Sequence, residues 1–317
     1  MTTIASGVRV PVPAIPPKGP VLSLLAASVA PTNEDDGAFE LNGEQIAMLP
    51  SELRLEIEAR TNEAWTRGIQ YAPENQAAAI VRAPNDYSTV LAVFTPANEA
   101  IVEVDPFVIE THYTCSPFGF EAIDYKGRAQ RQNDLATPAA IEKEFWDGAI
   151  AQAGGAPNNY LTKAGASTIL NPTLGTPVSI TAGLSLLQDA LRTGSGGQGM
   201  IHCVPGAAPS LINVRRVGKY MLDEFDNIVV PGVGYSGNGP IGAAGATPAP
   251  TATWMFATDL VMTRVQKEAR VFPDTMSEAL DRGQDLNPNT VTFRAERLAM
   301  AYFDGFRQFA VYVNLPS

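Results

Sequence analysis

Cysteine, histidine and glycosylation sites are scarce or missing in this sequence of 317 residues. Its only cysteines, Cys115 and Cys203, exclude a framework of disulfides and leave two alternatives: one bond, or two reduced and buried thiols. No Asn-x-Ser/Thr acceptor site occurs, which agrees with a protein that is not secreted. These absences favour a chain that is kept in a reducing cytoplasm.

Basic charge is also scarce. The 22 lysines and arginines are outnumbered by 33 aspartates and glutamates, which gives a formal net charge of −11. Arg215-Arg216 is the longest basic run, so the sequence lacks the basic face that an affinity-driven nucleic-acid binder needs. Charged residues make up only 17% of the chain, which favours a surface partly covered by neighbouring subunits. A wall of this charge would not adhere to nucleic acid beside it.

Patterns for catalysis and metal binding are missing as well. The candidate zinc ligands are His112, Cys115, His202 and Cys203. His202 and Cys203 are adjacent and would point to opposite faces of a strand, which does not suit zinc. The stretch 234–238, GYSGN, ends in asparagine where the nucleophile elbow of a serine hydrolase has glycine. We predict no catalytic, cofactor-binding or metal-binding residues and no enzyme; a glycosidase pair of distant carboxylates is the alternative left open.

One glycine-rich stretch, Gly194–Gly199, matches the pattern G-x-G-x-x-G of dinucleotide-binding turns. Such a site needs a strand before the glycines and a helix after them, so that the pyrophosphate meets the helix N-terminus. Here the order is reversed. Apolar residues at helical spacing predict a helix over 179–193, capped by Ser179 or Thr181, and a strand over 200–205 follows the glycines. We therefore interpret the glycines as a helix end and a turn.

No apolar segment is long enough to span a bilayer, and only the segment 21–30, VLSLLAASVA, suggests targeting. Prolines crowd the chain before it and Pro31 follows it. We therefore interpret residues 1–35 as an extended arm that ends in a short apolar anchor, with a signal-peptide core as the alternative. The arm should form neither helix nor central strand, and should lie along another subunit or stay disordered. Its anchor would be Val21, Leu22, Leu24 and Leu25.

The remaining patterns predict both helices and strands. The first half contains an ambiguous segment at 50–64, an extended hairpin or long loop at 69–100, two strands at 101–115 broken at Pro106, and a helix at 120–152. Thr137 followed by Pro138 is a helix-start signal, so we expect the helix at 120–152 to be kinked or divided there. Gly154-Gly155 should end it.

The second half alternates short strands and turns. After the helix at 179–193 we expect a strand at 200–205, a helix at 210–221 capped by Ser210, and a strand at 228–230. A Gly/Pro/Ala loop at 231–250 and a strand at 254–264 should follow. The chain should then form a short helix that opens with the capping box Thr275–Glu278, and two long strands at 291–313 joined by an Asp304-Gly305 turn. A loop as long as 231–250 is usually functional or mobile.

This order of elements resembles that of the major capsid proteins of tailed phages with the Hong Kong 97 fold, especially those of phages of actinobacteria. The residues that carry the resemblance are 102–152, 184–212, 253–274 and 290–315, and it covers roughly residues 65–317. Within the first of these, Glu142–Gly148 reads EKEFWDG and is similar to an acidic-aromatic stretch near the end of the long helix in that family.

The resemblance implies an α+β chain with four parts. An N-terminal arm, 1–45, would reach over a neighbouring subunit, and an extended loop, 60–100, would lie across the next one. A peripheral domain would comprise 101–178 and 254–317, with a spine helix at 119–152. An axial domain, 179–253, would point to the capsomer centre, with the 231–250 loop at the local symmetry axis.

The implied function is structural: hexamers and pentamers of the chain would form an icosahedral shell around double-stranded DNA in a virion, assembled in the host bacterial cytoplasm without a membrane. A portal and a decoration protein are further partners. The arm is too short to include a cleaved scaffolding segment, so a separate scaffolding protein is implied. The stretch 60–100 has no lysine, which argues against a cross-link from that loop. The alternatives are an encapsulin-like nanocompartment and a phage tail-tube protein.

Overall fold

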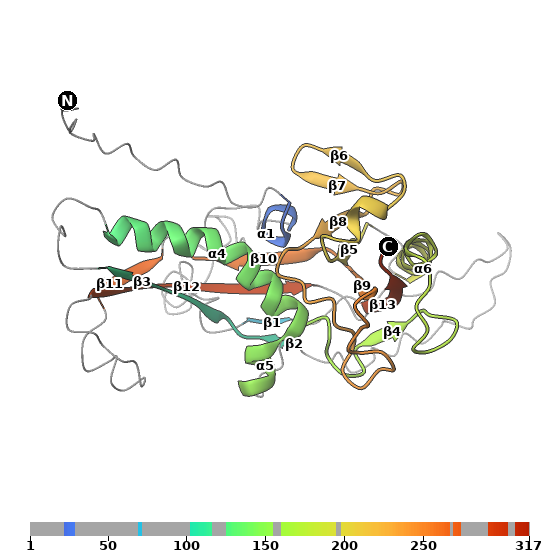
Figure 1. The fold of residues 1–317 in the computed structure, drawn as a ribbon, viewed down its shortest axis with the longest axis horizontal. Helices are drawn as coiled ribbons and strands as arrows, with labels where there is room; N and C mark the ends of the chain where they lie inside the picture. Colours follow the sequence, from blue (N-terminus) through green and yellow to red (C-terminus); the bar gives the residue numbers. More distant parts are fainter. Residues whose placement is uncertain are drawn as a thin grey trace, which may run out of the picture.

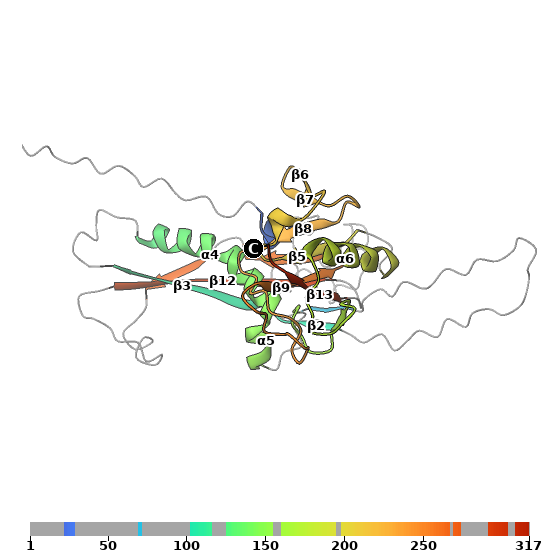
Figure 2. The same cartoon turned by 45° about the vertical axis from the view of Figure 1, so that its right-hand side comes forward.

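The computed structural model describes residues 22–28, 69–71, 102–115, 125–154, 160–194, 198–266, 269–273, 291–303 and 308–316. Over these residues the fold is α+β, as the sequence predicts. Two main sheets follow one another along the long axis of the molecule, and each has a long helix on one face (Figure 1). Figure 2 shows the same elongated arrangement, with α4 near one end and α6 near the other.

The four-stranded sheet is organised around its longest strand, β12 (Val291–Phe303). This strand pairs antiparallel with β3 (Phe107–Cys115), β10 (Val261–Val265) and β11 (Arg270–Pro273). Small side chains of β12, at Ala295, Ala299 and Ala301, are buried in clusters that they share with the helix α4 (Tyr125–Asp147). Alanine at these positions lets the helix lie close to the sheet.

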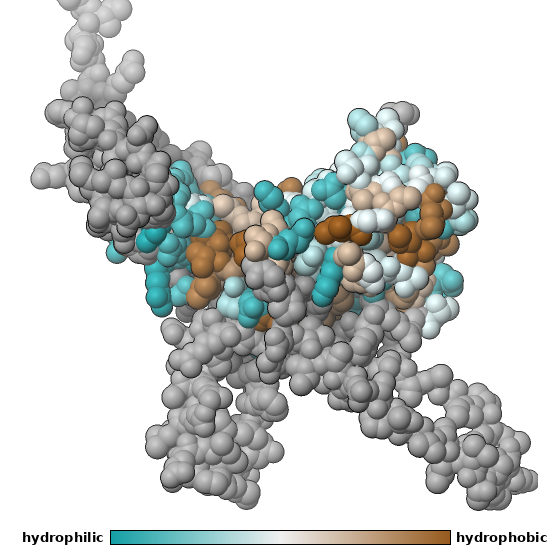
Figure 3. Space-filling model, turned by 90° about the horizontal axis from the view of Figure 1, so that it is seen from below, coloured by the Kyte–Doolittle hydropathy of each residue, from teal (hydrophilic) through white to brown (hydrophobic). Residues whose placement is uncertain are grey.

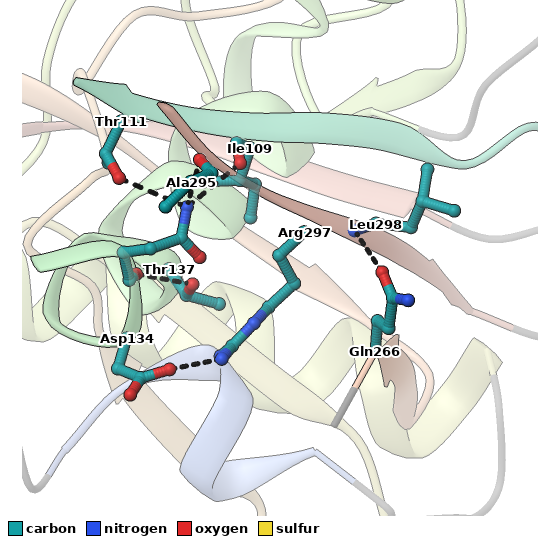
Figure 4. Close-up of polar contacts among 9 residues, drawn as sticks. Ile109, Thr111, Asp134, Thr137, Gln266, Ala295, Arg297 and Leu298 are labelled. Carbon is teal, nitrogen blue, oxygen red and sulfur yellow. Dashed lines mark hydrogen bonds and ion pairs between the residues drawn. The ribbon is translucent and has the colours of Figure 1, made fainter. Parts of the chain in front are cut away.

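Polar contacts also fix α4 to this sheet (Figure 4). Asn133 is fully buried, and its Nδ2 donates hydrogen bonds to the carbonyl oxygens of Ile109 and Ala295, at 3.0 Å each. One side chain therefore joins α4 to β3 and β12. The next residue, Asp134, forms an ion pair with Arg297 of β12. Because buried polar groups cost free energy unless they are paired, these contacts specify where the helix lies.

Pro138 lies inside α4, so of the two outcomes predicted there, a kink or a division, the division does not occur. A proline at this position leaves the Asp134 carbonyl without its helical N–H donor, which costs about 3 kcal/mol or more in a helix interior. Thr137, the predicted cap, instead donates its hydroxyl to the carbonyl of Asn133 at 2.7 Å. The buried contacts of Asn133 and Ile141 on the two sides of the proline keep the helix continuous. Residues 119–124 of the predicted spine helix lie outside the described residues.

The helix ends instead at Gly148, where the chain takes a left-handed φ of 61°. A Cβ at Gly148 would lie 2.2 Å from the ring of Tyr160, so only glycine fits. A short helix, α5 (Ala149–Gly154), follows at once. The carboxylate of Glu144 accepts hydrogen bonds from the N–H groups of Ile150 and Ala151 and so caps the start of α5.

The seven-stranded sheet has the strand order β4-β13-β9-β5-β8-β7-β6. Its strands are β4 (Ser167–Ile169), β5 (Met200–Cys203), β6 (Arg215–Val217), β7 (Tyr220–Leu222), β8 (Ile228–Pro231), β9 (Ala252–Thr258) and β13 (Gln308–Asn314). The helix α6 (Ile180–Gly194) covers one face, where Leu187 and Leu191 are fully buried among side chains of β5, β8, β9 and β13. The Ser179 hydroxyl accepts the N–H of Ala182 at 3.2 Å, so this helix and its predicted cap are confirmed.

The helix predicted at 210–221 is wrong: a short 3₁₀ turn (Ala208–Ser210) leads into a hairpin of β6 and β7. Asn213 has a left-handed φ of 60°, which ends any helix that starts at Ser210. Gly218, also with φ 60°, forms the turn between the paired residues Val217 and Tyr220. The helical spacing was misleading because Val217 is 48% exposed and does not face the core.

The two long strands predicted over 291–313, β12 and β13, both occur, but they do not pair with each other as predicted. β12 and β13 belong to different sheets, so residues 291–313 do not form a hairpin. The strand predicted at 254–264 is two strands, β9 and β10, which part at Asp259-Leu260 and enter different sheets. β4, β9 and β13 share a sheet with β5 and β8, so the seven-stranded sheet runs across the predicted boundaries at 178 and 254.

A third, two-stranded sheet joins the two ends of the predicted extended loop. β1 (Ile69–Tyr71) pairs antiparallel with β2 (Val102–Val104). β2 then leads through Asp105-Pro106 into β3, so the break predicted at Pro106 is confirmed. The ambiguous segment 50–64 and the capping box Thr275–Glu278 lie outside the described residues.

Candidate functional site

The stretch Glu142–Gly148, at the C-terminal end of α4, brings the arm, the 231–250 loop and both sheets together. Its aromatic residues fill the core between them, because Phe145 is 2% exposed and Trp146 is fully buried. The indole of Trp146 lies 4.6 Å from the ring of Tyr235 and meets Phe256 edge-on at 4.9 Å, measured between ring centroids. Aromatic pairs of this geometry add to the free energy of burial.

Glu142 connects three segments of the chain through one buried carboxylate. Its Oε1 accepts a hydrogen bond from the N–H of Leu24 at 2.8 Å, and its Oε2 accepts one from the N–H of Gly234 at 2.9 Å. The residue has no exposed surface. Burial raises the pKa of Glu142 above its ordinary value, although N–H donors of Gly234, Leu24 and Val233 act in the opposite direction.

The anchor of the arm contradicts one prediction. Residues Leu24–Ala27 form a one-turn helix, α1, whose N-cap hydroxyl at Ser23 accepts the N–H of Ala26 at 3.2 Å. Leu24 is fully buried in the same core cluster as Ile141 and Trp146. The prediction that the arm forms no helix and buries nothing in its own core is therefore wrong for residues 22–28. The reason is local, since no proline occurs between Pro20 and Pro31.

The anchor contacts the four-stranded sheet as well. The hydroxyls of Ser28 and of Thr263 on β10 lie 2.5 Å apart, and both residues are buried. Of the other predicted anchor residues, Leu22 and Leu25 are half-buried, and Val21 lies outside the described residues. The anchor is thus held at one end by Glu142 and at the other by Thr263.

The 231–250 loop packs on α4 through backbone and side-chain contacts. Trp146 donates its indole N–H to the carbonyl of Asn238 at 3.0 Å, and Ser236 donates to the carboxylate of Asp147 at 2.6 Å. A Cβ at Gly234 would lie 2.1 Å from the carbonyl oxygen of Ala139, so glycine is required for this close approach. The location of this loop at a symmetry axis stays a prediction.

The residues weighed as zinc ligands are separated by the fold. His202 and Cys203 point to opposite sides of β5, as predicted: His202 packs near Phe145 of α4, and Cys203 lies in the cluster under α6. Both nitrogens of His202 are used inside the chain, since Nδ1 lies 3.0 Å from the Tyr235 hydroxyl and Nε2 lies 2.9 Å from that of Thr258.

The other two candidate ligands, His112 and Cys115, lie on β3 of the four-stranded sheet, whereas His202 and Cys203 belong to the seven-stranded sheet. In the part of the chain that the structure describes, no three His, Cys, Asp or Glu residues form a metal-binding group.

Burial also decides the charge of these side chains. It lowers the pKa of His202 to about 3, so the ring is neutral at neutral pH. It raises the pKa of the Cys203 thiol to about 12, so the thiol is protonated at neutral pH. Their contacts are those of a satisfied core.

The glycine-rich stretch after α6 has the order of elements that the sequence predicts. Gly194 is the last residue of α6, and β5 begins at Met200, so a helix enters the stretch and a strand leaves it. Residues 195–197 lie outside the described residues. None of the described helices is both long and apolar enough to cross a membrane.

Composition and motifs did not reveal the role of Glu142. A sequence signal for a buried carboxylate was present, because EKEFWDG places two glutamates beside two aromatic residues in one helix. A helix that buries Phe145 and Trp146 must also bury one of the flanking carboxylates, and a buried carboxylate needs donors. The identity of those donors, in the arm and the loop, depends on contacts more than 90 residues apart in the chain.

No protein-family model matches this sequence, and neither does any curated protein. Among solved structures, the capsid of an empty GTA particle is 11% identical, with a TM-score of 0.48 over 99% of this chain and 95% of that chain. The SrpI encapsulin of Synechococcus elongatus is 9% identical, with a TM-score of 0.44 over 68% of this chain and 77% of that one. A chain of Mycobacterium phage Adephagia is 11% identical, with a TM-score of 0.41 over 80% and 86% of the two chains.

Leu24→Ala should lower the free energy of unfolding by about 2–5 kcal/mol, because it empties a fully buried position between α1 and α4. Leu25→Ala, at the half-buried neighbour, is the matched control and should cost about 1 kcal/mol. Urea unfolding followed by circular dichroism measures both values. Equal and small losses would show that the anchor is not part of the core of its own chain.

The stability that Glu142 confers should fall as the pH rises. Its pKa is raised on folding, so the folded chain holds this proton more tightly than the unfolded chain, whose value is 4.5. The contribution is therefore complete below pH 4.5 and is lost as the pH rises through the raised pKa.

The comparison of wild type with Glu142→Gln isolates this effect. Other titrating groups, such as His202, contribute equally to the unfolding free energy of both proteins, so their contributions cancel in the difference. The difference in unfolding free energy, wild type minus variant, should shrink as the pH rises from 4.5 and become constant above the folded pKa. Urea titrations at a series of pH values measure it. A difference that grows with pH would mean that folding favours the charged carboxylate, contrary to the burial seen here.

Proposed function

We propose that this chain is the structural subunit of a closed shell: a major capsid protein of the tailed-phage type that assembles around double-stranded DNA. The observation that carries the proposal is the order and pairing of the elements around α4. β1 pairs with β2, β2 leads into β3, and α4 lies on the sheet of β3 and β12. This is the strand, turn and spine-helix order that the family resemblance implies for residues 102–152.

The surface supports association rather than catalysis. Large hydrophobic side chains at several described positions are between about two fifths and two thirds exposed, among them Leu174, Ile212, Val217 and Val233. We propose that these exposed apolar side chains are available for burial between subunits.

The buried titratable groups support the same interpretation. Glu142, His202 and Cys203 are all used in packing or in hydrogen bonds to the chain's own segments. Side chains that are already occupied in this way hold the body of the subunit together and are not presented to a substrate.

The parts of the shell subunit can be assigned to the observed sheets. We assign the four-stranded sheet with α4 to the peripheral domain, and the seven-stranded sheet with α6 to the axial domain. The anchor, 22–28, stays with its own subunit, so the part of the arm before it is the segment that reaches a neighbour. The 60–100 loop extends from the β1-β2 pair across the next subunit.

The further partners follow from this role. Hexamers and pentamers of the chain form the lattice in the virion, and a separate scaffolding protein, a portal and a decoration protein complete the particle, assembled in the host cytoplasm. The net charge of −11 supports a wall that encloses DNA without binding its sequence. Assembly, rather than a chemical reaction, is the activity of this chain.

Electron microscopy of the purified chain, with its scaffolding protein if needed, tests the proposal. The expected result is closed shells or rings of five and six subunits that enclose DNA in the phage. Shells that instead enclose a cargo protein would indicate a nanocompartment, and tubes would indicate a tail-tube protein. A chain that stays monomeric under all these conditions would refute the shell role altogether.

A further inference from the structure

Among the residues that the structure describes, the two edge strands of the seven-stranded sheet differ in chemical character. The edge strand β6 is exposed on both faces, at Arg215, Arg216 and Val217. The opposite edge strand is β4, which has the same length of three residues. In Figure 1 the β6-β7 hairpin and β4 lie at opposite ends of the sheet. Each edge strand extends about 10 Å, so the two edges match in length.

The β6-β7 edge is basic and apolar. Val217 is 48% exposed, and the guanidinium of Arg216 makes one hydrogen bond, from its Nε to the carbonyl of Gly218 at 3.2 Å. Lys219 lies over the ring of Tyr220, 4.9 Å from its centroid. Neither Arg216 nor Lys219 has a carboxylate partner within the described residues. Arg215, the third basic residue of the hairpin, forms an ion pair with Asp226 at 2.6 Å, so the unpaired positive charge of this hairpin is that of Arg216 and Lys219.

The β4 edge is hollowed, apolar and acidic. A groove of about 460 Å³ lies between β4, β13 and α6. Leu170, Leu186, Ala190 and Phe309 supply its apolar lining, and Asp189 of α6 supplies a carboxylate. Asp189 is exposed, and its side chain has no ion pair among the residues that the structure describes. Figure 3 shows several apolar patches on one face of the molecule, one of them at the end where α6 and β4 lie.

We propose that the β6-β7 hairpin of one copy docks in the β4-α6 groove of a second copy, with Arg216 paired to Asp189. The two surfaces have opposite charge, and each combines this charge with exposed apolar area. Because they are different patches on opposite edges of one sheet, the contact is head-to-tail, and its repetition generates a ring when the rotation closes. The inference rests on the proposed shell function and deepens it, since it names the contact by which axial domains associate.

Charge reversal tests this contact in the full chain. Arg216→Glu places a negative charge opposite Asp189, and Asp189→Arg places a positive charge opposite Arg216. Each variant alone should raise the protein concentration needed for assembly about tenfold, as like charges meet in every copy of the contact. The double variant restores the pair and the net charge, and should assemble near the wild-type concentration. Sedimentation velocity measures the assembled fraction.

The control is Lys126→Glu, which makes the same change of charge at an exposed position on α4, away from both edges. If Arg216→Glu assembles at the same protein concentration as Lys126→Glu, the inference is overturned. That result would indicate that the basic edge only prevents sheet-to-sheet pairing. A double variant no better than the single variants would overturn it too. Lys219→Glu serves as a second variant if circular dichroism shows that Arg216→Glu is misfolded. Failure of the wild-type chain to assemble at all would count against the shell function instead.

Discussion

The buried carboxylate of Glu142 is the constraint on which the arrangement of the chain depends. A carboxylate without exposed surface needs donors, and here the donors are backbone N–H groups from the arm and from the 231–250 loop. Both segments must therefore pass within hydrogen-bond distance of one turn of α4. Since α4 is itself fixed to β3 and β12 by Asn133, one helix positions the arm, the loop and the four-stranded sheet together.

If the chain is the shell subunit proposed above, this arrangement fixes where each of its parts leaves the body. The anchor at 22–28 is bound to its own body, so the direction in which the preceding arm leaves is set by α4 and β10 rather than by a neighbour. The seven-stranded sheet presents two unlike edges, one basic and one acidic, which suits contacts that repeat from copy to copy.

The sequence predicts most elements but few of the contacts between them. Local signals located the helix α6 with its Ser179 cap, the break at Pro106 and the strands of 291–313. Two wrong predictions have local causes: left-handed residues at Asn213 and Gly218 form a hairpin in place of a helix at 210–221, and the proline-free stretch 21–30 allows a helical anchor in the arm. The pairing of β12 and β13 with different sheets, and the partners of Glu142, depend on long-range contacts that no local pattern encodes.

Hydrogen exchange at the N–H groups of Leu24 and Gly234 tests most directly whether Glu142 holds the arm and the loop to the body. The account predicts that both are protected in the wild-type chain and that one of the two loses protection in Glu142→Gln, because glutamine keeps one acceptor oxygen and its NH2 group opposes the other donor. The amides of α6 should be unchanged. An N–H of Leu24 that exchanges in the wild type as fast as in an unfolded chain would contradict it.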